Sequence, residues 1–121
     1  MSHRVLVVED DEAMAVALRD GFDYEGYEVV VARDGEAGLA MARSADPDLI
    51  ILDAMLPKRS GFLVLEKLRA MPKEERPKVV MISGNAGKRH QEGAASLGAV
   101  AFLNKPFRMD RLRETVEGIL A

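Results

Sequence analysis

The 121-residue sequence has no cysteine, which excludes both a disulfide framework and a metal site built on thiolates. It also lacks any apolar run approaching the ~20 residues that cross a membrane. Its first residues do not resemble a secretion signal. We therefore expect a soluble, cytoplasmic protein that has no membrane partner.

An excess of charge of one sign is missing as well. The chain carries 17 basic and 20 acidic side chains, for a formal net charge of -3. This balance gives no bulk attraction for nucleic acid, so we expect no direct nucleic-acid binding. A length of 121 residues suits one domain with one core. We expect residues 1–121 to form that domain, with no output domain in this chain.

What the sequence does contain is a repeat of short apolar runs separated by helix-like stretches. Continuous runs of Val, Ile and Leu are typical of strands covered on both faces, as in a parallel sheet flanked by helices. Strands alternating with helices through right-handed crossovers predict an open, doubly wound α/β domain. The five predicted strands are residues 4–9, 27–32, 48–53, 78–83 and 99–104.

The stretches between the strands carry helix signals of unequal strength. Asp11, Asp34 and Ser60 can cap the first three helices, and Gly26 can end the first. The fourth, residues 85–98, contains glycines and only a thin apolar face, so we expect it to be the least stable. Apolar residues at helical spacing predict the buried faces of the first helix (Met14, Ala17, Leu18, Phe22), the third (Leu65, Leu68) and the last (Met109, Leu112, Val116, Ile119, Leu120).

Acidic residues follow two of the predicted strands. The first strand ends at Glu9 and Asp10, and the third ends at Asp53. Since ligand sites of doubly wound sheets lie beyond the carboxyl ends of the strands, we expect these carboxylates to share one edge. If the two strands are neighbours, each pair of carboxylates at ~5 Å and an effective dielectric of ~20 repels by roughly 3 kcal/mol. A positive charge must therefore lie nearby.

Lys105, after the fifth strand, supplies one positive charge against three negative ones. The remaining two charges match a divalent cation held by hard oxygen ligands. We predict Mg²⁺, because few protein ligands leave room for waters and a phosphate oxygen. A metal beside Asp53, the ammonium of Lys105 and the hydroxyl of Ser83 are the groups that phosphoryl transfer onto a carboxylate requires.

At these positions the sequence resembles the receiver domain of two-component response regulators. Four segments carry the resemblance in order, VVEDD at 7–11, DAMLPKRSG at 53–61, MISG at 81–84 and FLNKPF at 102–107. The resemblance implies a flavodoxin-like sheet of order 2-1-3-4-5. It also implies a phosphoacceptor regulatory domain that catalyses its own phosphorylation and dephosphorylation, with a sensor histidine kinase or phosphotransfer protein as the donor.

The resemblance gives each matching residue of the acidic edge a role. Asp53 is the expected phosphoacceptor and, with Asp10, a direct Mg²⁺ ligand. The carbonyl of Met55 should complete the protein's share, while Glu9 acts through metal-bound water. The family's acidic pair lies directly after the two valines, so Glu9 and Asp10 are assigned to it and Asp11 remains as a helix cap.

The same resemblance assigns residues at the fourth and fifth strands. Ser83 and Lys105 should hold phosphoryl oxygens, and the Lys105–Pro106 peptide bond should be cis. Phosphorylation should draw Ser83 toward the phosphoryl group and let Phe102 turn inward. This two-state switch would change the face formed by the fourth helix, the fifth strand and the fifth helix, which a downstream effector protein or output domain reads.

Two departures from the family pattern bear on this face. Phe102 stands where many members have tyrosine, so the ring has no hydroxyl to hydrogen-bond. Val100 and Ala101 stand where the winged-helix transcription-factor subfamily usually carries two acids that form inter-subunit salt bridges. We therefore expect a monomer or weak dimer, whose switching face is read by a partner protein.

Other functions fit the sequence less well. A haloacid-dehalogenase-like phosphatase needs a D-x-D pair closing its first strand, but Asp53 is followed by Ala54 and Met55. A flavodoxin-like nucleotide binder needs a Ser/Thr/Gly loop that cradles phosphate, and the acidic loop 9–12 would repel one. The alternative that stays open is a receiver-like interaction module that works without phosphorylation.

Overall fold

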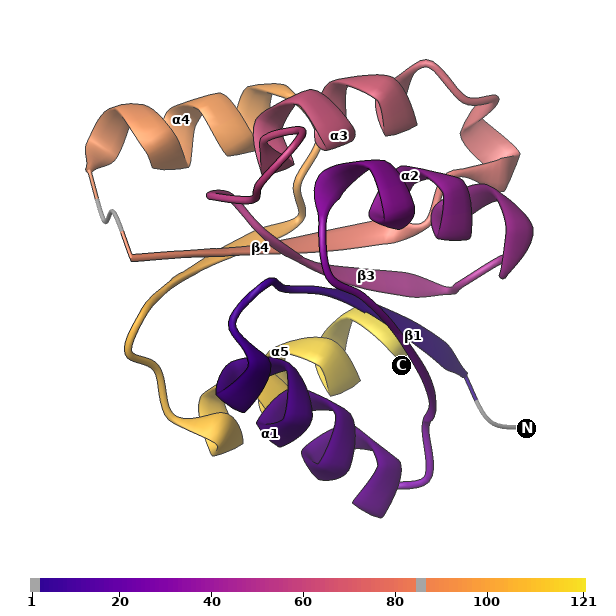
Figure 1. Cartoon of the computed structure of the whole chain (residues 1–121), viewed down its shortest axis with the longest axis vertical. Coiled ribbons are helices and arrows are strands. Elements are labelled where there is room, and N and C mark those ends of the chain that lie inside the picture. The colour runs from indigo at the N-terminus through magenta and orange to yellow at the C-terminus, as the bar shows by residue number, and fades with distance from the viewer. Residues whose placement is uncertain (1–2, 85–86) are drawn as a thin grey trace.

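Five parallel strands form one sheet in the order β2-β1-β3-β4-β5 (Figure 1). The structure is a computed structural model that describes residues 3–84 and 87–121. The predicted fold class and strand order are confirmed. The strands are β1 (Arg4–Val8), β2 (Glu28–Ala32), β3 (Leu49–Asp53), β4 (Lys78–Ser83) and β5 (Ala101–Asn104).

Helices cover both faces of the sheet, with α2, α3 and α4 on one face and α1 and α5 on the other (Figure 1). Within the described ranges, no helix has the length and apolar character that crossing a membrane requires. The helices are α1 (Glu12–Tyr24), α2 (Gly35–Ser44), α3 (Gly61–Arg69), α4 (Lys88–Ser96) and α5 (Met109–Leu120), and a short 3-10 turn, η1, spans Lys73–Glu75.

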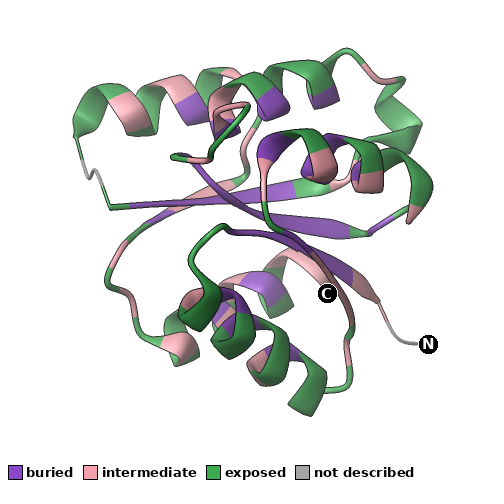
Figure 2. Cartoon of the chain, viewed as in Figure 1, coloured by how far each residue is buried: buried purple, intermediate pink, exposed green. Residues whose placement is uncertain are grey.

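The alternation of side chains along each strand builds two apolar cores, one on each face of the sheet. Leu6 and Val8 of β1 point toward α2 and α3, whereas Val5 and Val7 point toward α1 and α5. The middle strands β1, β3 and β4 are buried along almost their whole length, as Figure 2 shows. Continuous apolar runs are therefore required in these strands, because both of their faces pack against helices.

The predicted caps lie where the sequence placed them. The side chains of Asp11, Asp34 and Ser60 accept hydrogen bonds from the backbone N–H groups of the first turns of α1, α2 and α3. Gly26 follows α1 with a φ of 91°, a conformation that favours glycine. These short-range signals depend only on neighbouring residues, which is why they could be predicted.

Several predicted details were wrong. Ala15, and not Ala17, lies on the buried stripe of α1, because it is three residues before Leu18 whereas Ala17 is turned away by about 100°. The fifth strand begins at Ala101 and not at residue 99. The fourth helix begins at Lys88, and the first two residues of its predicted range, 85 and 86, lie outside the described residues.

Candidate functional site

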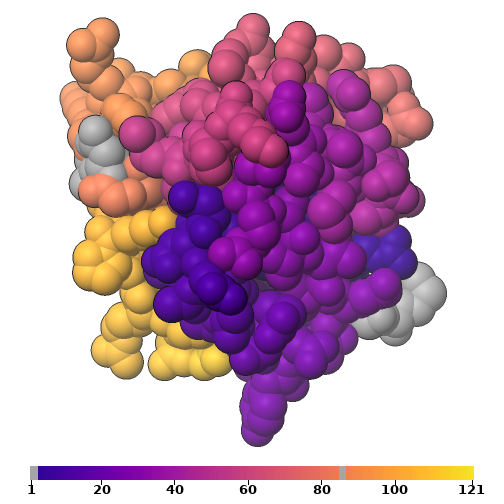
Figure 3. All heavy atoms as spheres, viewed as in Figure 1, coloured from indigo at the N-terminus to yellow at the C-terminus, as the bar shows by residue number. Residues whose placement is uncertain are grey.

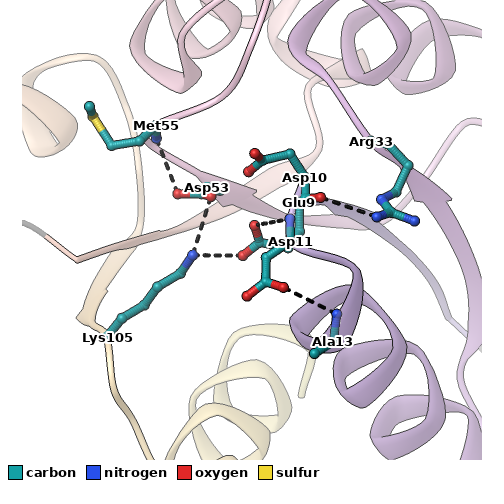
Figure 4. A network of polar contacts seen from close by, with 8 residues as sticks. All are labelled: Glu9, Asp10, Asp11, Ala13, Arg33, Asp53, Met55 and Lys105. Atoms are coloured by element: carbon teal, nitrogen blue, oxygen red, sulfur yellow. Dashed lines mark hydrogen bonds and ion pairs between the residues drawn. The ribbon is translucent and has the colours of Figure 1, made fainter.

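The register of the central strands brings the three predicted carboxylates together. Val8 of β1 pairs with Leu52 of β3, so the residues that follow, Glu9 and Asp53, lie level at the end of the sheet. Carboxylate oxygens of Glu9, Asp10 and Asp53 all lie within 4.8 Å of one another. Figure 4 shows these side chains converging beyond β1 and β3. The expected acidic cluster is therefore present.

The members of the cluster differ in their exposure to solvent. The side chain of Glu9 is fully buried, and Asp53 is 3% exposed. Asp10 lies on the surface and closes the cluster on the solvent side. A small cation could therefore approach from solvent past Asp10, while two of the carboxylates stay shielded from water.

Lys105 enters the same cluster from the loop after β5. Its Nζ lies 2.7 Å from Oε1 of Glu9 and 3.2 Å from Oδ2 of Asp53 (Figure 4). One ammonium thus faces three carboxylates, which leaves two negative charges uncompensated among these four side chains. The sequence did not predict the direct pair between Lys105 and Glu9, because the family resemblance gives this lysine a role toward phosphoryl oxygens.

Burial and charge shift the pKa values of this pair. Burial raises the pKa of Glu9 above its ordinary value and Asp53 adds to the rise, while the hydrogen bond from Lys105 only partly opposes it. Burial by itself lowers the pKa of Lys105, but the hydrogen bond to Glu9 and the charges of Asp53 and Glu9 outweigh it and raise the pKa. The lysine therefore stays charged near neutral pH, and Glu9 is poised to gain from a further cation.

Backbone N–H groups hold the carboxylates in position. The N–H of Met55 donates to Oδ1 of Asp53 at 3.1 Å, and the N–H of Asp11 donates to Oε2 of Glu9 at 3.1 Å. Gly61 lies so close that a Cβ there would be 2.2 Å from the carbonyl oxygen of Asp53. Only glycine fits at this position, and the start of α3 is thereby packed directly against the end of β3.

The remaining predicted residues lie on the other side of β3. Ser83 is buried at the end of β4, one residue beyond Ile82, which pairs with Asp53. The carbonyl of Ser83 accepts a hydrogen bond from the N–H of Lys105 at 2.7 Å. The Lys105–Pro106 peptide bond is cis, and Phe102 is half-buried on β5 opposite Met81. The strands that flank β3 thus place Ser83 on one side of Asp53 and Glu9 on the other.

Arg33 is a further residue of the site, and it was not predicted from the sequence. It follows β2, and its Nη2 donates a hydrogen bond of 3.1 Å to the carbonyl oxygen of Asp10 (Figure 4). The signal was available, because β2 also ends at the carboxyl edge of the sheet. Arg33 adds a cation to the rim of the cluster and ties Asp10 to the end of β2.

Sequence comparison shows which known proteins the chain is similar to. The family model described as response regulator receiver domain matches residues 5–117. The chain is 35% identical over 120 residues to the alkaline phosphatase synthesis transcriptional regulatory protein PhoP of Bacillus subtilis, covering 99% of this chain and 49% of that protein. It is 42% identical over 106 residues to the response regulator PleD of Caulobacter vibrioides, covering 88% of this chain and 23% of that protein. The chain thus spans half or less of these two relatives.

Structural comparison gives the same result for the fold. A CheY-like response regulator receiver domain protein from Methanospirillum hungatei superposes with a TM-score of 0.92 at 29% identity, covering 99% of this chain and 94% of that one. The receiver domain of the Pseudomonas aeruginosa sensor histidine kinase PA1611 superposes with a TM-score of 0.87 at 24% identity, covering 98% and 97%. That structure has a magnesium ion coordinated in its active site cleft.

Proposed function

This chain belongs to the response regulator receiver family of two-component systems, and from the geometry of its acidic edge we propose that Asp53 accepts a phosphoryl group in a Mg²⁺-dependent reaction. The observation that carries the proposal is the convergence of three carboxylates and one lysine at the ends of β1, β3 and β5. The donor would be a sensor histidine kinase or a phosphotransfer protein, and the readout would go to a downstream effector protein or output domain.

The side chains present fit a magnesium ion. All three acidic ligands offer oxygen atoms, and the uncompensated charge of the cluster equals that of one divalent cation. Asp10, Asp53 and the carbonyl of Met55 would hold the ion directly, with Glu9 acting through water. When bound, the ion supplies positive charge that reduces repulsion between Asp53 and an incoming phosphoryl group.

The nucleophile of the proposed reaction is the carboxylate of Asp53, which backbone and lysine contacts hold in position. An Oδ atom of Asp53 attacks the phosphorus, the new P–O bond forms, and the bond between phosphorus and the donor nitrogen breaks with its electron pair left on the donor. The ammonium of Lys105 can stabilise the negative charge of the phosphoryl oxygens during transfer, because its Nζ already lies 3.2 Å from Oδ2 of Asp53. The hydroxyl of Ser83 would also hold a phosphoryl oxygen, since Ser83 ends the strand beside β3.

The same residues would link phosphorylation to the surface formed by β5 and α5. Ser83 and Lys105 are joined through the backbone, and Lys105 begins the loop between β5 and α5. A groove of about 560 Å³ lies along this loop. We propose that movement of Ser83 and Phe102 on phosphorylation reshapes the α4-β5-α5 face. The groove is lined by Phe102, Leu103, Asn104, Phe107, Arg108, Asp110, Arg111 and Glu114.

Labelling with a small phosphodonor tests the proposal. Incubation with acetyl phosphate and Mg²⁺ should add one phosphoryl mass to the native protein and none to Asp53→Asn. Asp20→Asn, on the exposed face of α1, is the matched control and should label like the native chain. Labelling that survives Asp53→Asn would contradict the assignment. A folded native chain that never labels would favour the phosphorylation-independent interaction module.

A further inference from the structure

The first turn of α2 contacts the loop that carries the proposed ligand Met55. A Cβ added to Gly35 would lie 2.0 Å from the carbonyl oxygen of Arg59, and real side chains do not approach a backbone atom so closely. The N–H of Gly35 also points to the carbonyl of Pro57, at 3.4 Å. The loop after β3 can therefore keep its course only because residue 35 has no side chain.

The same turn of α2 contacts β1, the strand that leads to Glu9 and Asp10. A Cβ added to Gly38 would lie 2.7 Å from Cγ1 and 3.0 Å from Cγ2 of Val8. Val8 is the last residue of β1 and directly precedes Glu9. One helical turn, with two glycines three residues apart, thus touches both segments that bear proposed metal ligands. Figure 3 shows the chain after β1, the start of α2 and the loop after β3 adjoining on one face.

One polar contact also joins α2 to the loop after β3, but it is weak. Asp34, which caps α2, lies 3.6 Å from Nζ of Lys58, a loop residue with a φ of 66°. The lysine side chain is 62% exposed, so this ion pair contributes little. The close approach at the two glycines therefore limits where the loop and the strand end can lie, in addition to the strand register.

We propose that the first turn of α2 is a positioning element for the metal site, in which Gly35 sets the place of the loop bearing Met55 and Gly38 sets the place of the strand end bearing Glu9 and Asp10. This inference rests on the proposed function, because it assumes that these residues bind Mg²⁺. The ion requires near-octahedral ligands at about 2.0–2.1 Å, so a ligand segment moved by roughly 1 Å no longer fits.

The first test is a Mg²⁺ titration of Gly35→Ala, in which the backbone amide shifts of residues 53–61 report binding. The dissociation constant should rise by about 10- to 100-fold, the range found when residues behind the ligands are changed. The matched control is Gly118→Ala in α5, the same substitution at a helical glycine whose added Cβ meets no atom within 4 Å. This control should bind Mg²⁺ like the native chain.

A second pair of variants separates positioning from a general loss of stability. Gly38→Ala should also weaken Mg²⁺ binding, because its Cβ displaces Val8. Adding Val8→Ala removes the side chain that clashes, so the double variant should recover Mg²⁺ affinity. Val8 is fully buried, so the single variant Val8→Ala should lower the free energy of unfolding while its Mg²⁺ affinity stays near that of the native chain. Val8→Ala would then be less stable and still bind Mg²⁺, whereas Gly38→Ala would bind it weakly, and a general loss of stability does not produce this difference.

The outcomes distinguish this inference from the function on which it rests. A native chain that binds no Mg²⁺ overturns the metal site and this inference together. A native chain that binds Mg²⁺, with Gly35→Ala and Gly38→Ala equal to it, overturns the inference alone. If Gly35→Ala does not fold, the Gly38 variants decide, and failure of Val8→Ala to restore affinity counts against positioning.

Discussion

Lys105 and Glu9 form an ion pair across the carboxyl edge of the sheet, with Nζ 2.7 Å from Oε1, although 96 residues separate them in the chain. The lysine shares its ammonium with Asp53, the proposed phosphoacceptor, at 3.2 Å. It is therefore the direct link between the acidic cluster and the loop that leads into α5.

Lys105→Met keeps an aliphatic side chain but removes the positive charge that contacts Asp53. The variant should still be phosphorylated by acetyl phosphate, because the attacking carboxylate and the proposed metal ligands remain. It should lose most of the amide shift changes in β5 and α5 that phosphorylation produces in the native chain, since the ammonium no longer pulls this loop. Lys67→Met, on the exposed side of α3, is the control. If phosphorylation changes the amide shifts of Lys105→Met as much as those of the native protein, Lys105 does not couple Asp53 to this loop.

Glu9→Gln should change how stability depends on pH. The folded-state pKa of Glu9 is raised above its ordinary value of 4.5, mainly by burial. A raised pKa contributes stability that is complete below the unfolded-state value and is lost as pH rises through the folded-state value. The glutamine variant has no such titration, so it should become progressively more stable than the native chain as pH rises from 4.5, then hold a constant lead.

Urea unfolding in EDTA over this pH range measures the difference in free energy of unfolding. Added Mg²⁺ should reduce it, because a cation stabilises the ionised form of Glu9. A native chain that gains on the variant as pH rises would show that Glu9 is held more strongly by Lys105 than burial disfavours it.

Asp10→Asn should have opposite effects with and without metal. Without metal, the loss of one exposed negative charge relieves repulsion and should raise stability by less than about 1 kcal/mol. At a Mg²⁺ concentration ten times the dissociation constant, the native chain should gain about 1.4 kcal/mol and the variant much less. Asp11→Asn is the matched control, because asparagine caps a helix as well as aspartate. An equal gain in Asp10→Asn and the native chain would exclude Asp10 as a ligand.

The face around β5 should not hold two copies of this chain together tightly. Val100 is 49% exposed at the start of this face, and Ala101 follows it, so neither residue can supply an acid to an inter-subunit salt bridge. After activation with beryllofluoride, which stands in for the phosphoryl group, the protein should sediment as a monomer at micromolar concentration. A tight dimer would show that other residues of α4 or α5 decide association.

Much of the fold could be predicted because its signals are local. Continuous apolar runs marked the strands, and the residues that cap α1, α2 and α3 lie two or three positions from the N–H groups they bind. The acidic edge could be predicted too, because parallel strands end on the same side of a sheet. Errors arose where a local pattern allowed two phases, as with Ala15 and Ala17 on α1.

By itself, the sequence determined which residue types reach the carboxyl edge, because Glu9 and Asp10 follow one buried apolar run and Asp53 ends another. Only the tertiary structure decided which groups meet there. The pairing of Lys105 with Glu9, the bond from Arg33 to the carbonyl of Asp10 and the contact of Gly35 with Arg59 join segments distant in the chain. Such contacts depend on strand register, on side-chain direction and on how closely a helix can approach a loop. A local sequence pattern does not reveal these quantities, because each is set by all the elements packed around it.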